Sequence, residues 1–273
     1  MVTAWTVGIL LLCSLVPSMA HAAENGCTPS RSGSALRAEV LSASSLNAQA
    51  SSKGKVKMKV VTSIGKMKYH YNANGLLTQV IRPYTKTTYR YAGKRLKSYT
   101  DMQTIYSSPE QAMTTKLHYD KKGRIVKSVG SKKSSSISYI RLYSYDKKGR
   151  ASKVVYTDSN NGSKLVRTYT YDRKGRVVKE VQKDVTANLR NDLSRIKYNK
   201  KGLVACEITN GPTIKYQYTF NAAGQIASMK NNESYGWRKY KYKTISIPKG
   251  YAGLVRQQQH ILVQYPEGRQ RYQ

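Results

Sequence analysis

A seven-residue unit recurs at a fixed spacing in the middle of this chain. The sequence Tyr-Asp-Lys-Lys-Gly-Arg-Ile at 119–125 returns with small changes at 145–151 and at 171–177, and the glycines of successive copies are 26 residues apart. Looser copies flank these three on both sides, centred on Gly75, Gly93, Gly202 and Gly224. Self-similarity of this kind predicts a repeat architecture in which each copy forms one supersecondary unit.

The residue types in the unit predict that each copy is a β-hairpin. An apolar or aromatic residue precedes the repeat Tyr by two positions, so both side chains stand on one face of a strand. Asp or Asn then opens a tight turn by accepting a backbone N–H, and Gly three residues later supplies a positive φ. A type I turn closed by a left-handed glycine is a common hairpin connection. The predicted structural turn residues of the central copies are Asp120, Gly123, Asp146, Gly149, Asp172 and Gly175.

Seven consecutive hairpins predict an all-β fold. We expect an extended antiparallel meander of about seven repeated hairpins over 55–250, in a twisted or partly curled sheet. The segments 55–60 and 240–247 alternate cleanly and are predicted strands at the two ends of the sheet. The remainder, 251–273, is predicted to be a C-terminal strand or tail, with a final strand at 259–265. In repeat proteins such terminal segments cover the sheet edges.

The unit resembles the YD repeat of the Rhs family, whose signature is Tyr-Asp-x-x-Gly-Arg followed by an apolar residue. The three central copies match it closely and the others loosely, over residues 65–230, about 60% of the chain. In that family the repeats form extracellular β-sheet shells, often curled, in bacterial toxins and cell-surface proteins. The resemblance therefore implies a secreted or surface-attached β-sheet protein. Family members that enclose a toxin have many more repeats and a distinct domain after them, so a full shell with its cargo is not expected here. The resemblance carries over no catalytic residue.

Residues 1–22 predict a secretory signal peptide. About a dozen apolar residues run from Trp5 to Val16, fewer than the roughly 20 needed to cross a bilayer, and Ala20-His21-Ala22 forms a cleavage pattern. An uncleaved anchor is the alternative, because no Lys or Arg precedes the apolar run. Residues 23–54 are rich in Ser and Ala and are predicted to be a flexible leader, with a short helix as the alternative. The mature protein is then secreted, extracellular or attached to the cell surface, with no stable membrane span after cleavage.

Two cysteines remain after the predicted cleavage, Cys27 and Cys206. In an oxidising compartment they can form a disulfide that joins the leader to the repeats. Two unpaired thiols are the alternative, because the sequence does not determine the distance between them.

Basic residues concentrate at the hairpin turns. The chain has 48 Lys and Arg against 14 Asp and Glu, a net charge of +34. In a meander the turns fall on one edge, where their cations form a ridge that suits a polyanion. The expected partner is an anionic polymer of the cell envelope, teichoic acid or similar, or extracellular nucleic acid. The alternative is that these cations keep an open sheet soluble and prevent edge pairing. The predicted polyanion-binding residues are Lys121, Lys122, Arg124, Lys147, Lys148, Arg150, Arg173, Lys174, Arg176, Lys200 and Lys201.

The sequence contains no recognisable catalytic, cofactor-binding or metal-binding motif. We therefore expect a non-enzymatic protein without a cofactor or a metal. Two other classes stay open: an Rhs-like toxin or adhesion component without its own catalytic domain, and an extracellular enzyme with an unrecognised site. The 23 Tyr also leave two interpretations open, packing within the sheet or stacking against sugars or bases.

Overall fold

The computed structural model describes residues 54–104, 109–134, 138–187, 189–211, 213–233 and 236–264, and over 189–193 and at 264 it describes the backbone alone. The predicted signal peptide, the leader and Cys27 lie outside the described residues.

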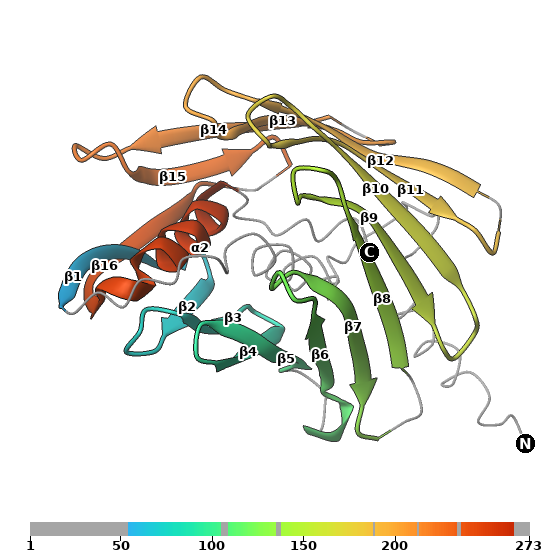
Figure 1. Ribbon diagram of the computed structural model, residues 1–273. Coiled ribbons are helices and arrows are strands. Elements are labelled where there is room, and N and C mark those ends of the chain that lie inside the picture. The colour runs from blue at the N-terminus through green and yellow to red at the C-terminus, as the bar shows by residue number, and fades with distance from the viewer. Residues whose placement is uncertain are drawn as a thin grey trace, which may run out of the picture.

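Sixteen antiparallel β-strands and one α-helix account for most of this part of the chain (Figure 1). The strands are β1 (Lys55–Ile64), β2 (Met67–Tyr71), β3 (Leu77–Ile81), β4 (Thr85–Ala92), β5 (Arg95–Gln103), β6 (Met113–Tyr119), β7 (Ile125–Lys132), β8 (Ser138–Tyr145), β9 (Ala151–Asp158), β10 (Lys164–Tyr171), β11 (Val177–Asp184), β12 (Leu189–Tyr198), β13 (Val204–Ile208), β14 (Ile214–Phe220), β15 (Ile226–Asn231) and β16 (Arg238–Pro248). Two short 3₁₀ segments, η1 (Pro109–Gln111) and η2 (Lys249–Tyr251), and the helix α2 (Ala252–Gln264) complete the elements.

The first and last strands pair with each other, and this closes the sheet into a barrel. The pairing runs from Lys55 opposite Pro248 to Ile64 opposite Tyr240, with one irregularity near Ser63. The predicted open meander, twisted or partly curled, is therefore wrong. The segments expected to cover two separate sheet edges satisfy each other's backbone hydrogen bonds instead. Closure is the one arrangement that removes both edges of an antiparallel sheet.

The C-terminal segment forms a helix where a strand over 259–265 was predicted. Ala252 and Val255 of α2 are buried against Val60, Leu76 and Ile247. In the next turn of the helix, two consecutive glutamines contact the sheet. The Gln259 side chain accepts from the Val61 N–H at 2.7 Å and donates to the Tyr71 hydroxyl at 3.1 Å. The Gln258 side chain accepts from the Leu77 N–H at 3.2 Å and donates to the Tyr91 hydroxyl at 3.2 Å. Tertiary contacts thus override the strand-like run of apolar residues.

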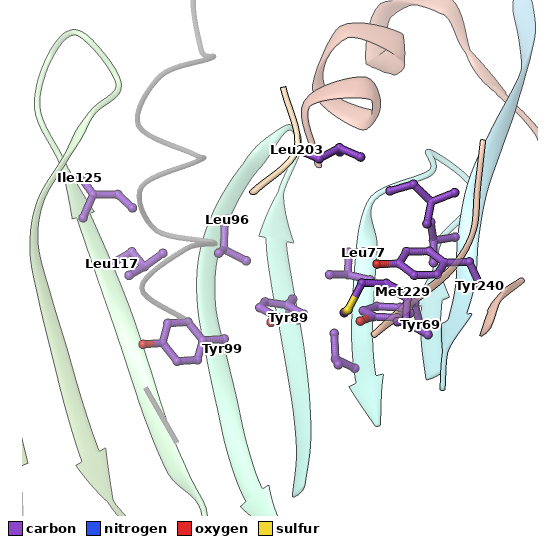
Figure 2. Close-up of a cluster of buried hydrophobic side chains, with 14 of the residues drawn as sticks. Tyr69, Leu77, Tyr89, Leu96, Tyr99, Leu117, Ile125, Leu203, Met229 and Tyr240 are labelled. Carbon is purple, nitrogen blue, oxygen red and sulfur yellow. The ribbon is translucent and has the colours of Figure 1, made fainter. Parts of the chain in front are cut away.

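The core lies on the inner face of the barrel, near the repeat turns. Tyr, Leu and Ile side chains from many strands meet there, several of them the residues two positions before a repeat Tyr. Figure 2 shows these side chains converging from neighbouring strands. The labelled members are Tyr69, Leu77, Tyr89, Leu96, Tyr99, Leu117, Ile125, Leu203, Met229 and Tyr240. Full burial of each such side chain stabilises the fold by about 1.5–3 kcal/mol.

The inner face also holds a buried arginine. Arg141 is only 3% exposed, and its Nη1 donates to the hydroxyls of Tyr139 at 3.0 Å and Tyr99 at 3.3 Å. Its guanidinium lies 4.1 Å from the centre of the Tyr139 ring, and Tyr139 in turn shares a hydrogen bond with Thr115. The ring occupies the space above Gly130, where a Cβ atom would come within 2.2 Å of it. These polar contacts offset the cost of burying the charge.

Barrel closure predicts a disulfide between cysteines placed at Lys57 and Ser246, which are directly opposite each other on β1 and β16. In a Cys27→Ser/Cys206→Ser background, the double variant Lys57→Cys/Ser246→Cys should cross-link intramolecularly under mild oxidation, because opposed positions have Cβ atoms about 4.5–5.5 Å apart. Peptide mapping by mass spectrometry would detect the bond. A matched pair, Lys57→Cys/Thr219→Cys, places one thiol on β14 and should stay reduced. Equal cross-linking of both pairs, or of neither, would contradict the closed barrel.

Candidate functional site: the rim of repeat turns

Each repeat turn is held by the side chain of its first residue. In the β8–β9 turn, the N–H groups of Lys148 and Arg150 both donate to Asp146 Oδ1 at 2.9 Å. The Gly149 N–H donates to the Asp146 carbonyl at 2.9 Å, and Gly149 has a φ of 76°. Side chains larger than hydrogen are strained in that left-handed region. The turns opened by Asp120 and Asp172 share this geometry.

The arginine that follows each turn glycine pairs with the aspartate that opens the turn. Arg150 places Nε at 2.7 Å and Nη2 at 2.6 Å from Asp146 Oδ2. Its guanidinium also lies over the ring of Tyr171, the Tyr of the next repeat, at 4.4 Å. The same two contacts recur for Arg124 with Asp120 and Tyr145, and for Arg176 with Asp172 and Tyr198. Each arginine therefore links its own turn to the next hairpin.

The tyrosine beneath each arginine completes the link through its hydroxyl. Tyr171 OH donates to the Ala151 carbonyl at 2.5 Å, and Tyr198 OH donates to the Val177 carbonyl at 2.8 Å. Each acceptor is the residue directly after the stacked arginine. We call this chain of aspartate, arginine and next-repeat tyrosine the arginine–tyrosine ladder. A hydrogen bond contributes about 1 kcal/mol net, and an exposed cation–π contact about 0.5–1 kcal/mol.

The ladder divides the predicted basic residues into two groups. Arg124, Arg150 and Arg176 are half-buried, with 24–29% of their side chains exposed, and they are engaged within the protein. The other eight are exposed at the tips of four adjacent turns, and we call them the charged arc. One of them, Lys201, also lies over the Phe220 ring. The charged arc comprises Lys121, Lys122, Lys147, Lys148, Arg173, Lys174, Lys200 and Lys201.

A pattern within the sequence distinguishes the two groups. Each of the three repeat turns that opens with Asp has Arg four positions later, whereas the repeat turns that open with Asn72, Asn199 or Asn221 have Leu or Gln there. In these six turns, the residue four positions after the first turn residue is charged where that first residue is Asp, and uncharged where it is Asn. All eleven cations were predicted to bind alike, although this pattern already distinguishes the three arginines.

The charged arc covers only part of the rim. The consecutive-strand topology brings all seven repeat turns to one end of the barrel. The tips of the β2–β3 and β14–β15 turns carry Asn and Ala, and Lys94 of the β4–β5 turn lies 5.4 Å from the Tyr251 ring. Gly75 of the β2–β3 turn packs closely against Ile247 and Val255. The segment that forms η2 and α2 therefore lies against the β2–β3 and β4–β5 turns, and the charged arc occupies the four turns that follow them along the rim.

The structure adds little about the predicted disulfide, a metal site or a membrane-spanning helix. Cys206 is half-buried on β13, but Cys27 is outside the described residues, so their disulfide stays a prediction. In the described part of the chain, no three His, Cys, Asp or Glu side chains gather in a way that could hold a metal ion. No helix there is long and apolar enough to span a bilayer.

Comparisons with known proteins give distant structural likenesses. No protein-family model and no curated protein matches the chain. A porin-like protein from Bacteroides uniformis ATCC 8492 is 14% identical, with 71% of this chain and 94% of that chain covered and a TM-score of 0.43. TcdB2–TccC3 without its hypervariable C-terminal region is 10% identical over 66% of this chain, which spans 12% of that chain, with a TM-score of 0.30. The Photorhabdus luminescens Tc holotoxin pore is 11% identical over 66% and 14% of the two chains, with a TM-score of 0.21. At these values the likenesses support no statement about the activity of the present chain.

The ladder predicts how substitutions at Asp120 change stability and its pH dependence. Partial burial raises the pKa of Asp120, but hydrogen bonds from the backbone and side chain of Arg124 outweigh it and hold that pKa below its ordinary value. The stabilisation is therefore complete above the unfolded-state pKa, about 4, and is lost as the pH falls through the lower folded-state pKa. Asp120→Asn should remove this acid-dependent part yet keep the oxygen that accepts the backbone N–H groups.

Asp120→Ala should be less stable than Asp120→Asn at pH 7 by about 1 kcal/mol, because it also loses the backbone acceptor. Urea unfolding of both variants between pH 3 and pH 7 measures the two effects. Equal midpoints for the Asn and Ala variants at pH 7 would contradict the role assigned to the turn oxygen.

Proposed function

We propose that this protein is a secreted, non-enzymatic β-repeat protein that binds anionic polymers of the cell envelope through the charged arc. One observation carries the proposal: eight exposed cations stand on four adjacent turns of one rim. The aspartates of the three central turns are already engaged by Arg124, Arg150 and Arg176, so they do not pair with the arc. Secretion rests on the signal-peptide pattern of residues 1–22.

The spacing of the arc favours cooperation among its charges. Successive hairpins are about 9–10 Å apart, since neighbouring strands are separated by about 4.8 Å. The Debye length at physiological salt is about 8 Å, so the fields of adjacent tips overlap. The ladder holds the turns in place before binding. Less conformational entropy of the protein is therefore lost when a polymer binds.

Barrel closure weakens the alternative that these cations only protect an open sheet. A closed barrel has no edge for another chain to pair with, so edge protection has no target. A purely solubilising role also predicts cations on every turn. The turns opened by Asn72 and Asn221 carry none at their tips, although they share the rim.

The chemistry of the tips favours recognition by charge. The tip positions of the charged arc carry Lys and Arg without an aromatic side chain, so they suit phosphate groups and offer no surface for stacking bases. A flexible phosphodiester polymer such as teichoic acid fits this description best. Extracellular nucleic acid would be bound through its backbone alone.

Replacing all eight residues of the charged arc with Gln should weaken binding to long-chain polyphosphate by at least a hundredfold at 50 mM salt. Each lost phosphate contact removes counterion release, so the dependence of affinity on salt should also become shallower. Fluorescence anisotropy with labelled polyphosphate across a salt series measures both quantities.

The matched control removes eight exposed cations scattered over the outer wall of the barrel: Arg90, Lys97, Lys116, Lys153, Lys164, Lys183, Lys197 and Lys215. This variant has the same net charge as the arc variant and should bind nearly as well as the wild-type protein. An equal loss of affinity in the two variants would mean that net charge alone drives binding, and the proposal would fail.

A further inference from the structure

The pairing of the first and last strands reproduces the register of a repeat hairpin. In the β6–β7 hairpin, Tyr119 lies opposite Ile125, and the adjacent register shift leaves one extra residue on the returning strand. In the pair of chain ends, Tyr242 of β16 lies opposite Val61 of β1, and the register shifts at the same place. The two strands therefore form an eighth hairpin without a covalent turn, which we call the chain-end hairpin.

A ring of hydrogen bonds supports this equivalence. On every even-numbered strand, one tyrosine hydroxyl donates to a carbonyl of the preceding strand. The Tyr242 hydroxyl donates to the Ile226 carbonyl at 2.8 Å, and the Tyr71 hydroxyl donates to the Val61 carbonyl at 2.6 Å. The chain-end hairpin is thus joined into the ring on both of its sides.

Backbone pairing alone holds the chain-end hairpin to its neighbours at few positions. On one side, Ser63 lies opposite Lys68 and Ile64 lies opposite Met67. On the other side, β15 and β16 pair at two positions among the described residues, whereas β8 and β9 pair at seven. A two-stranded hairpin is at best marginally stable by itself in water, so other contacts must hold this one in the barrel.

The arginine–tyrosine ladder does not extend to the first two repeat tyrosines, Tyr71 and Tyr91. The turn before Tyr91 has Leu76 at the position of the ladder arginine, and β1 instead of a repeat turn precedes Tyr71. The helix α2 places two consecutive glutamines at these tyrosines, Gln258 at Tyr91 and Gln259 at Tyr71.

Each glutamine closes a small loop of three hydrogen bonds. Gln259 Nε2 donates to the Tyr71 hydroxyl at 3.1 Å, this hydroxyl donates to the Val61 carbonyl, and the Val61 N–H donates back to Gln259 Oε1 at 2.7 Å. Gln258 forms the same loop with Tyr91 and the first residue of β3. The glutamines thus connect β1 and β2 with β3 and β4, as the arginines connect the central hairpins.

The start of α2 is attached to the chain-end hairpin and to the first repeat turn. Ala252 and Val255 are buried in one cluster with Val60 and Ile247 of the chain-end hairpin, and the helix lies beside β1 and β16 in Figure 1. A Cβ atom added at Gly75 would come within 3.0 Å of Val255, so the β2–β3 turn packs closely on the helix. The helix therefore contacts both sides of the line between β1 and β2.

We propose that α2 is a latch. It takes the place of the ladder arginines at Tyr71 and Tyr91 and holds the chain-end hairpin against the first two repeat hairpins. Release of the latch opens the barrel locally between β1 and β2, while the central hairpins keep their own ladder and stay folded.

Hydrogen–deuterium exchange of the full chain tests the latch, because local opening exposes the amides of the opening strands only. In the variant Gln258→Ala/Gln259→Ala, the amides of β1 and β16 should exchange at least tenfold faster than in the wild-type protein. Val61 is left out of this comparison, since its N–H loses its acceptor directly. Exchange in β8 to β11 should change less than twofold.

Two matched variants separate local opening from general destabilisation. Arg256→Ala removes an exposed side chain of the same helix and should exchange like the wild type. Arg150→Ala removes a ladder arginine and should accelerate exchange in β9 and β10, with β1 and β16 still protected. Unchanged exchange of β1 and β16 in the glutamine variant, or an equal increase in all strands, would overturn the latch. If the double variant does not fold, the single variants Gln258→Ala and Gln259→Ala give the same comparison.

Discussion

In the arginine–tyrosine ladder, one side chain both shapes a turn and connects it to the next hairpin. Asp146 shapes its own turn through backbone N–H groups and also holds Arg150, which covers Tyr171 of the next hairpin. The hydroxyl of Tyr171 returns to the carbonyl of Ala151. Local turn chemistry and contact between repeats are therefore one network. Its repetition joins each of the three central turns to the hairpin that follows it.

The ladder also separates the cations that stabilise the fold from those that stay exposed at the turns. Each central turn carries an arginine whose charge its own aspartate compensates, so this cation serves the fold. The tip residues stand outside that network and remain exposed. Within one seven-residue unit, the Asp and Arg stabilise the fold, and the tip residues are the ones proposed to bind the polymer. A substitution in one group is expected to leave the other largely intact.

The turns could be predicted from the sequence because their causes are local. Asp146 and Gly149 lie within four residues of each other and need no distant contact to form the turn. Closure could not be predicted in the same way, because Val56 and Ile247 pair across most of the chain and no local pattern links them. The run Ile261–Val263 looks like a strand on its own. It is helical because Gln258 and Gln259 hydrogen-bond to the inner face of the sheet.

The candidate site was partly predictable for the same reason. The position of the eleven basic residues at turns follows from the repeat, so their common edge was expected. Their division into engaged arginines and exposed tips depends on contacts between neighbouring repeats, such as Arg176 with Tyr198. The sequence did indicate this division, because Asp and Arg occur together in the three central copies of the unit.

Lysine footprinting can show whether a polyanion binds at the charged arc. The protein is acetylated at low reagent concentration with and without saturating polyphosphate, and modification at each lysine is measured by mass spectrometry. We expect strong protection at the tips, for example at Lys121, Lys147 and Lys174, and unchanged modification of Lys97 and Lys153. Equal protection across all exposed lysines, or none at the tips, would contradict it.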